Sequence, residues 1–406
     1  MATFAPAACS VLATTAPMRL AAPVTSAQRP SRLACRAEPV TLAPNFGLLP
    51  ARLHYRDSHD FSTMSRAELP VPSDEARSLS VALAAKIRGE IARAGGWIDF
   101  ARYMELALYA PGLGYYSAGS TKLGAAGDFV TAPELSRSFA RALGLTLDAE
   151  LAALASNDVL ELGAGSGVLA ANLLDTFARL GRDARYFILE PSADLKQRQQ
   201  RALAPFAGRV QWLEQLPTAP FCGVVVANEV LDALPVARFV IERGEPRALG
   251  VIATQHGLKW ERARASPELV GAVRAIERAL GRALADGYCS EVCLALPAWL
   301  SALGACLERG SLLFVDYGLA RSDYYHEQRA DGTLVCHYRH RAHDDPFVYP
   351  GLQDITAWVD FSACAQAATA AGFAVAGFTT QGQYLLSVLA ALPPALAVDL
   401  SSPQEQ

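Results

Sequence analysis

The sequence is short of three features that would each name a class of protein. It has no apolar run of about 18 residues, the length of a membrane-spanning helix, because Pro393 and Pro394 interrupt the longest late candidate, residues 385–400. It has no basic excess, since 36 Lys and Arg stand against 40 Asp and Glu, and a dedicated nucleic-acid binder usually shows one. Its 8 cysteines are scattered over 406 residues, which indicates reduced thiols and no disulfide framework.

Acidic residues are absent from positions 1–37, where arginines stand among Ala, Ser, Thr and Pro. Such a start is typical of an organelle transit peptide. Prolines between Pro6 and Pro30 interrupt any amphipathic helix there, so a disordered extension, or a true start at Met64, stays open. We expect no folded element before Ser65.

The remaining chain has the composition of a folded protein, with 51% apolar and 19% charged residues. Short apolar segments alternate with segments of helical periodicity. The segments that read as strands are residues 158–162, 186–189, 210–213, 224–227 and 311–315. Strands that alternate with helices predict an α/β fold with a Rossmann-like, doubly wound parallel sheet. Weaker antiparallel strands are expected within residues 236–265, and Leu386 and Val388 are expected in the sheet.

A glycine-rich turn follows the strand at 158–162, with Gly163, Gly165 and Gly167. The dinucleotide fingerprint would need another glycine at Val168, and no Gly-Lys-Ser/Thr follows, so NAD, FAD and P-loop sites are disfavoured. The form E-L-G-x-G-x-G, which starts at Glu161, resembles the first motif of class I S-adenosylmethionine-dependent methyltransferases. A plain tight turn between strand and helix is the alternative.

Polar residues stand at the ends of two further strands. Glu190 follows residues 186–189, where a doubly wound nucleotide site places a carboxylate for the ribose hydroxyls. Asn228, Glu229 and Asp232 follow residues 224–227. The methylases of nucleic-acid amines carry [D/N]-P-P-[F/Y] at that point, and this sequence lacks it, so no nucleic-acid partner is expected. An exposed strand-end acid is the alternative for Glu190.

Several segments together resemble the MidA-like family of class I methyltransferases, which includes the mitochondrial complex I assembly-factor arginine methyltransferase. The segments are residues 103–116 with 127–134, 161–167, 228–235, 316–318 and 353–361. The resemblance spans about residues 78–388. It implies S-adenosyl-L-methionine as cofactor and methyl transfer to a protein arginine linked to the assembly of respiratory complex I (NADH dehydrogenase). The partner it implies is a protein substrate, possibly a complex I core subunit.

A guanidinium acceptor needs carboxylates that match its charge and orient its nitrogen. The expected catalytic residues are Glu229, Asp232 and Asn228. The expected cofactor-binding residues are Glu161, Gly163, Gly165, Gly167, Glu190 and Asn228. The expected substrate-binding residues are Tyr115, Tyr116, Asp128, Phe129 and Glu134. The alternatives are helix capping for Asp232 and Glu134, a turn role for Asp128, and core packing for the aromatic residues.

This interpretation divides the chain into a disordered or targeting segment (1–72), an N-terminal helical substrate cap (73–150), a methyltransferase core (151–390) with an insertion at about 236–305, and a tail (391–406). We expect no metal, and a surface loop for His337, His340 and His343. A small-molecule methyltransferase and a non-catalytic assembly factor that retains the fold are the competing functions. The expected location is cytoplasmic, as in bacterial relatives, with a mitochondrial transit peptide in residues 1–37 as the alternative.

Overall fold

The computed structural model describes residues 9–16, 69–118 and 137–397. All described residues belong to one unit, formed by residues 1–18 and 63–406. The other unit, residues 19–62, lies outside the described residues.

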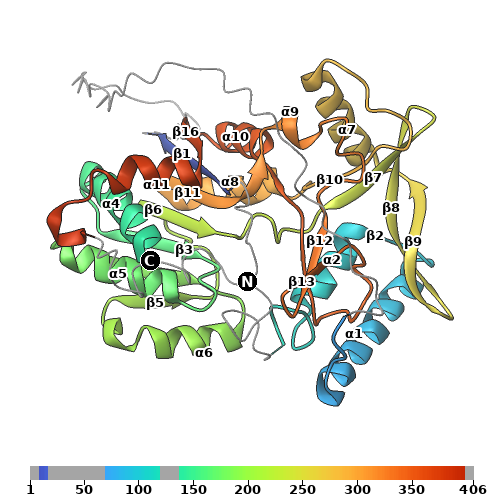
Figure 1. Ribbon diagram of the computed structural model, residues 1–406, viewed down its shortest axis with the longest axis horizontal. Coiled ribbons are helices and arrows are strands. Elements are labelled where there is room, and N and C mark those ends of the chain that lie inside the picture. Colours follow the sequence, from blue (N-terminus) through green and yellow to red (C-terminus); the bar gives the residue numbers. More distant parts are fainter. Residues whose placement is uncertain (1–8, 17–68, 119–136, 398–406) are drawn as a thin grey trace, which may run out of the picture. The chain divides into compact units, whose positions relative to one another are not determined.

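The central sheet is built on parallel strands in the order β5-β4-β3-β6-β11. Its members are β3 (Asp158–Leu162), β4 (Arg185–Leu189), β5 (Val210–Leu213), β6 (Phe221–Asn228) and β11 (Leu307–Leu319). The chain proceeds from β3 outward through β4 and β5, then returns to the other side of β3 for β6 and β11 (Figure 1). The predicted doubly wound parallel sheet is confirmed. Its switch point lies between β3 and β6, where ligands bind in such sheets.

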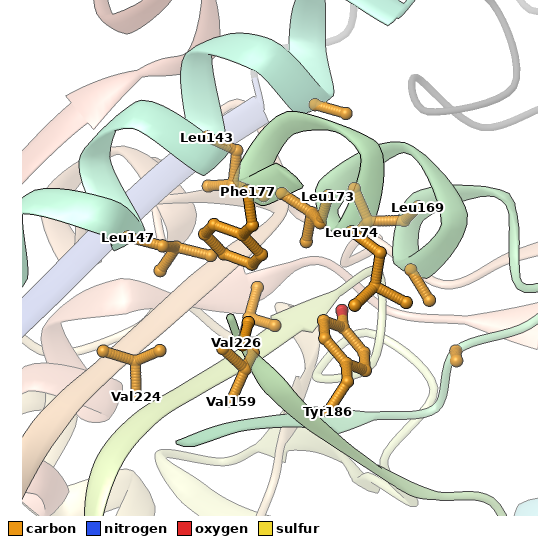
Figure 2. Close-up of a cluster of buried hydrophobic side chains, with 14 of the residues drawn as sticks. Leu143, Leu147, Val159, Leu169, Leu173, Leu174, Phe177, Tyr186, Val224 and Val226 are labelled. Carbon is orange, nitrogen blue, oxygen red and sulfur yellow. The ribbon is translucent and has the colours of Figure 1, made fainter. Parts of the chain in front are cut away.

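Helices cover both faces of this sheet. On one face, α4 (Arg137–Leu154) and α5 (Val168–Arg179) pack against the strands, and Figure 2 shows their Leu143 and Phe177 above Val159 and Val226. On the other face, α8 (Leu296–Cys306) and α10 (Phe361–Ala370) form a second cluster. Helix α4 lies within residues 73–150, which were expected to form the cap, but its buried side chains pack in the core of the central sheet. The apolar face of α4 therefore packs against the central sheet and α5, not against the cap.

Most strands of a second sheet come from the inserted segment. The strand order of this sheet is β10-β7-β8-β2, and β9 also pairs with β8. Its strands are β2 (Ile98–Asp99), β7 (Ala237–Glu242), β8 (Glu245–Thr254), β9 (Gly257–Arg264) and β10 (Cys289–Val292). The antiparallel strands expected within residues 236–265 are therefore confirmed. The helices of this region are α1 (Asp74–Arg93), α2 (Phe100–Tyr109) and α7 (Pro267–Leu280). Side chains of α1 and α2 share one core cluster with Val236 and Val251 of the insertion.

The remaining elements are short. They are α6 (Ala193–Ala202), α9 (Arg321–Tyr324), β12 (Val335–Tyr338), β13 (Arg341–His343), β14 (Asp354–Thr356), β15 (Val359–Asp360), and the 3-10 turns η2 (Ala204–Phe206) and η3 (Pro394–Leu396). Strand β12 pairs with β13 and with β14. No helix among the described residues has both the length and the apolar content that a membrane span requires.

Two segments differ from expectation. Strand β1 (Cys9–Ala16) lies in the central sheet, antiparallel to β11 and to β16 (Val375–Thr380), although no folded element was expected before residue 65. The segment contains no proline and carries Val and Thr, which suits an extended strand; only a helix had been considered there. Leu386 and Val388, expected in the sheet, lie instead on helix α11 (Gln381–Leu389), whose first turn is capped by the Thr380 hydroxyl.

Candidate active site

The glycine turn between β3 and α5 has a backbone that suits glycine. The φ angles of Gly163, Gly165 and Gly167 are +63°, +54° and +83°, in the left-handed region that side chains disfavour. A Cβ on Gly163 would lie 3.1 Å from Cγ2 of Val230, and one on Gly167 would lie 3.3 Å from Cα of Gln199. The turn is thus in contact with the segment after β6 and with helix α6.

Glu161 is buried beneath this turn, with an exposed fraction of 2%. Its carboxylate accepts a hydrogen bond from the Tyr186 hydroxyl at 2.8 Å. Burial raises the pKa of Glu161 to about 7; the Tyr186 hydrogen bond opposes this rise, and the nearby Glu190 adds to it. A positive charge placed beside Glu161 would lower its pKa and so favour its ionised form at neutral pH.

Glu190 directly follows β4, at the sheet edge where the glycine turn lies. Its Oε1 accepts a hydrogen bond from the backbone N–H of Ser192 at 3.0 Å. Its Oε2 accepts one from Nε2 of Gln199 at 2.9 Å, and the same nitrogen donates to the Gly165 carbonyl at 3.0 Å. Glu190 is therefore linked to the glycine turn through Gln199. Its ribose-binding role stays a prediction.

Asn228 and Glu229 stand where β6 ends, on the other side of the switch point. The Asn228 Oδ1 atom is buried and has no hydrogen-bond partner among the described residues. Glu229 has a φ of +53°, and its N–H donates to the Val315 carbonyl of β11 at 2.8 Å. A left-handed conformation at a residue other than glycine costs on the order of 1–3 kcal/mol and is concentrated at functional sites.

Asp316 of β11 holds the segment after Glu229 in place. Its Oδ2 accepts backbone hydrogen bonds from Val230, Leu231 and Asp232 at 3.0, 2.7 and 3.3 Å. Burial raises the pKa of Asp316 to about 7, and these N–H groups act in the opposite direction. Residues 231–234 form a turn, and no helix follows it. Helix capping, the alternative considered for Asp232, therefore does not apply.

Asp232 is 8% exposed and lies among other carboxylates. Burial raises its pKa well above the ordinary value, and Asp316, Asp354 and Glu229 raise it further. The carbonyl of Asp232 accepts from the N–H of Ala357 at 3.0 Å, which fixes the segment next to β14. A cation placed among these carboxylates would lower their pKa values and be stabilised in return.

Two tyrosines from the end of α2 and the loop behind it meet this cluster. The Tyr116 hydroxyl donates to Oδ1 of Asp354 at 2.9 Å, and its ring stacks on Tyr109 with centroids 5.5 Å apart. The Tyr109 hydroxyl donates to the Ala233 carbonyl at 2.8 Å. Burial raises the pKa of both tyrosines, and Asp354 is the largest electrostatic contributor in each case. Both side chains therefore stay protonated near neutral pH.

Of the other predicted substrate residues, only Tyr115 is described, and it does not join the site. Tyr115 is 1% exposed in the core cluster of α1 and α2, edge-on to Tyr116 at 5.0 Å. This is the core packing that was its alternative. Asp128, Phe129 and Glu134 lie outside the described residues. His340 is exposed in a turn, as expected, but His337 lies on β12 and His343 on β13, so the surface loop expected for all three is wrong for these two. Burial, with a smaller effect of His343, lowers the pKa of His337 to about 4.

Four residues of the site were missed by sequence reasoning: Asp316, Asp354, Tyr109 and Gln199. Asp316 follows a predicted strand and Asp354 lies in a segment that carries the family resemblance. Both positions are typical of functional carboxylates, but neither residue was assigned a role. Gln199 occupies the buried position four residues after Leu195 on α6, and a polar residue on a buried helix face is such a signal. Tyr109 carried none.

The residues at the switch point fit S-adenosylmethionine. Oδ1 of Asn228 is buried and has no partner within the part of the chain that the structure describes, so it suits an amino group. A side chain at Gly163 or Gly167 would crowd Val230 or Gln199, so the turn presents bare backbone to a ligand. Gly163, Gly165, Gly167 and Asn228 would hold the amino-acid part, and Glu190 the ribose. The sheet order, the glycine turn and the strand-end carboxylate define the class of the protein as a class I S-adenosylmethionine-dependent methyltransferase.

The comparisons with known proteins give the family. A family model described as "Putative S-adenosyl-L-methionine-dependent methyltransferase" matches residues 142–379. The chain belongs to this methyltransferase family, and the predicted MidA-like resemblance, enzyme class and cofactor are confirmed.

The relatives include both named enzymes and a solved structure. The mitochondrial "Protein arginine methyltransferase NDUFAF7 homolog" of Drosophila melanogaster is 28% identical over 325 residues, 72% of this chain and 71% of that protein. The mitochondrial "Protein arginine methyltransferase NDUFAF7" of Danio rerio is 28% identical over 66% of this chain and 68% of its own length. A crystal structure from Burkholderia thailandensis, bound to S-adenosyl-homocysteine, is 46% identical with a TM-score of 0.74, over 80% of this chain and 87% of that one.

Proposed function

We propose that this methyltransferase transfers the methyl group to the guanidinium of a protein arginine. The observation that carries the proposal is the group of carboxylates formed by Asp232, Asp354 and Glu229 beside the stacked rings of Tyr109 and Tyr116. Buried carboxylates of like charge are costly together. A planar cation relieves that cost, and aromatic faces stabilise it further.

Bound S-adenosylmethionine supplies an electrophilic methyl group on a sulfonium. The chain's own residues then have two tasks. Asp232 and Glu229 match the charge of the guanidinium and orient one nitrogen for in-line attack. Asp316 keeps both in place, because its Oδ2 accepts the three N–H groups of the segment that carries them.

A proton must leave the guanidinium when its nitrogen is alkylated, and Asp232 is placed to receive it. An acid whose pKa is raised by burial and by neighbouring carboxylates holds a proton near neutral pH more readily than an ordinary aspartate. The arriving cation lowers this pKa and leaves the anion that grips it. The methylated product remains a guanidinium cation, because its nitrogen gains the methyl group and gives one proton to the Asp232 carboxylate. The sulfonium charge is lost in the transfer, which raises the pKa of Asp232 again and favours uptake of that proton.

The proposed acceptor is a protein, with a subunit of respiratory complex I as the first candidate. Two of the relatives are named protein arginine methyltransferases, and the MidA-like family contains the complex I assembly factor. The same two relatives are named mitochondrial. We therefore propose a mitochondrial location, the alternative considered above. Because β1 belongs to the central sheet, this proposal does not include cleavage of residues 1–37 as a transit peptide. Cell fractionation with N-terminal sequencing of the mature protein tests it, and a cytosolic pool alone would contradict it.

A matched pair of acceptors tests the arginine assignment. Arginine-containing fragments of complex I subunits are compared with fragments in which citrulline, a neutral isostere, replaces arginine. We expect calorimetric binding of the arginine fragment in the presence of S-adenosyl-homocysteine, tightening as the pH rises because Asp232, whose pKa is raised, then loses its proton. The citrulline fragment should bind at least tenfold more weakly. Equal affinities for the two would contradict a site built for a cation.

A further inference from the structure

We propose that Gln199 is a cofactor-positioning residue, which fixes the ribose-binding carboxylate and the glycine turn relative to each other. Gln199 lies on α6 and is 0% exposed. It is outside every segment that carries the family resemblance, and none of the predicted roles used it. The inference rests on the S-adenosylmethionine cofactor and is independent of which acceptor the enzyme uses.

The side chain of Gln199 connects three parts of the fold. Its Nε2 donates to Oε2 of Glu190 at 2.9 Å and to the carbonyl of Gly165 at 3.0 Å. Its Oε1 accepts from the indole N–H of Trp212, on β5, at 2.9 Å. The amide thus joins the end of β4, the turn after β3 and the next strand of the sheet.

The partners determine which way the amide points. Carboxylate and carbonyl oxygens only accept hydrogen bonds, and the indole N–H only donates. The nitrogen of Gln199 must therefore face Glu190 and Gly165, and the oxygen must face Trp212. A glutamate at this position would have the same shape but would place an oxygen against two acceptors.

The arrangement sets the geometry of two cofactor contacts at once. The bonds from Ser192 and Gln199 fix the plane of the Glu190 carboxylate, and a carboxylate can accept about four hydrogen bonds in defined directions. The bond to the Gly165 carbonyl fixes the middle of the glycine turn. Affinity for a ribose hydroxyl depends on this orientation, because an acceptor held in place loses no entropy when the ligand arrives.

The test measures binding, not turnover. S-adenosyl-homocysteine and its 2′-deoxyribose analogue are titrated by calorimetry into the full chain. The dissociation constant of the analogue divided by that of S-adenosyl-homocysteine measures how much the ribose 2′-hydroxyl contributes to binding. Gln199→Glu and Gln199→Leu should each weaken S-adenosyl-homocysteine about tenfold, the effect of one hydrogen bond to a charged group. They should also reduce the ratio. Gln200→Leu, an exposed neighbour on the same helix, should change neither quantity.

A double-mutant cycle separates positioning from general stability. If Gln199 acts through Glu190, Gln199→Leu should cost little further affinity in a Glu190→Gln background. Independent, additive losses, or an unchanged ratio with Gln199→Glu, would overturn the proposal. The ratio does not depend on the fraction of folded protein, so a variant of lower thermal stability remains informative. If the wild type discriminates between the two ribose forms but methylates no arginine, the result would count against the proposed acceptor and not against the role of Gln199.

Discussion

Glu161 gives a prediction whose magnitude follows from the structure. Its pKa is 4.5 in an unfolded chain and about 7 in the fold, because burial disfavours its charged form. Between these values the unfolded chain has lost its proton while the folded chain keeps it. The Glu161 contribution to stability therefore falls as the pH rises from about 4.5 to about 7 and is constant above. The two values differ by about 2.5, which amounts to about 3 kcal/mol.

Glu161→Gln removes this titration and keeps an oxygen that can accept from Tyr186. The free energy of unfolding of both proteins is measured in urea from pH 5 to pH 8.5. The difference, variant minus wild type, should grow by roughly 2.5 kcal/mol over that range, because part of the effect lies below pH 5. Any offset that the amide adds does not change with pH. Other groups that titrate in the same range cancel in this difference.

Tyr186→Phe is the matched control for the direction of the effect. Its hydroxyl bond holds the pKa of Glu161 down, so its loss should raise that pKa and extend the fall in stability to higher pH. A difference between Glu161→Gln and wild type that stays flat from pH 5 to pH 8.5 would refute the reasoning. Glu161 would then carry its charge inside the fold without the cost of burial.

Three further substitutions separate catalysis, acceptor binding and folding. Glu229→Gln should abolish methyl transfer but leave the calorimetric affinity for S-adenosyl-homocysteine within about twofold. Retained turnover would contradict the catalytic role of Glu229. As the control, Asp323→Asn changes an exposed carboxylate and should behave as wild type. Asp354→Asn should raise the acceptor KM about 10-fold or more with a smaller effect on kcat, since a charge-assisted hydrogen bond is lost; an unchanged KM would exclude it from the acceptor site. Asp316→Asn should lower the urea unfolding free energy by about 1–3 kcal/mol because the three N–H groups lose a charged acceptor; full stability would show that they have other partners.

The sheet could be predicted from sequence because its signals are local. Strand β3 and the turn after it are an apolar run that ends in glycines, and β5 and β3 have the predicted bounds. Strand β1 could not be found in the same way, since its partners β11 and β16 lie about 300 residues or more away in the sequence, and nothing within residues 9–16 indicates such a pairing. A long-range pairing leaves no periodic signal at the strand itself.

The site was predictable in part for the same reason. Glu190, Asn228 and Glu229 stand at strand ends, and the rule that parallel strands direct their carboxyl ends to one edge brings them together. Asp354 lies on β14, in the three-stranded sheet with β12 and β13, and Tyr109 is the last residue of α2. They reach the cluster only because α2 and β14 pack on the loop after β6, through Ala233 and Asp232. Such tertiary placement is invisible in one sequence.

The central claim is methyl transfer from S-adenosylmethionine to an arginine side chain. The most direct test incubates the full chain with S-adenosylmethionine that carries a deuterated methyl group and with complex I subunits, then locates the label by tandem mass spectrometry. We predict a deuterated methyl group on a guanidino nitrogen, present with wild type and absent with Glu229→Gln. Label found only on another residue type, or only on a small molecule, would contradict the arginine assignment. No label on any acceptor, with the cofactor bound, would leave a fold without the proposed chemistry.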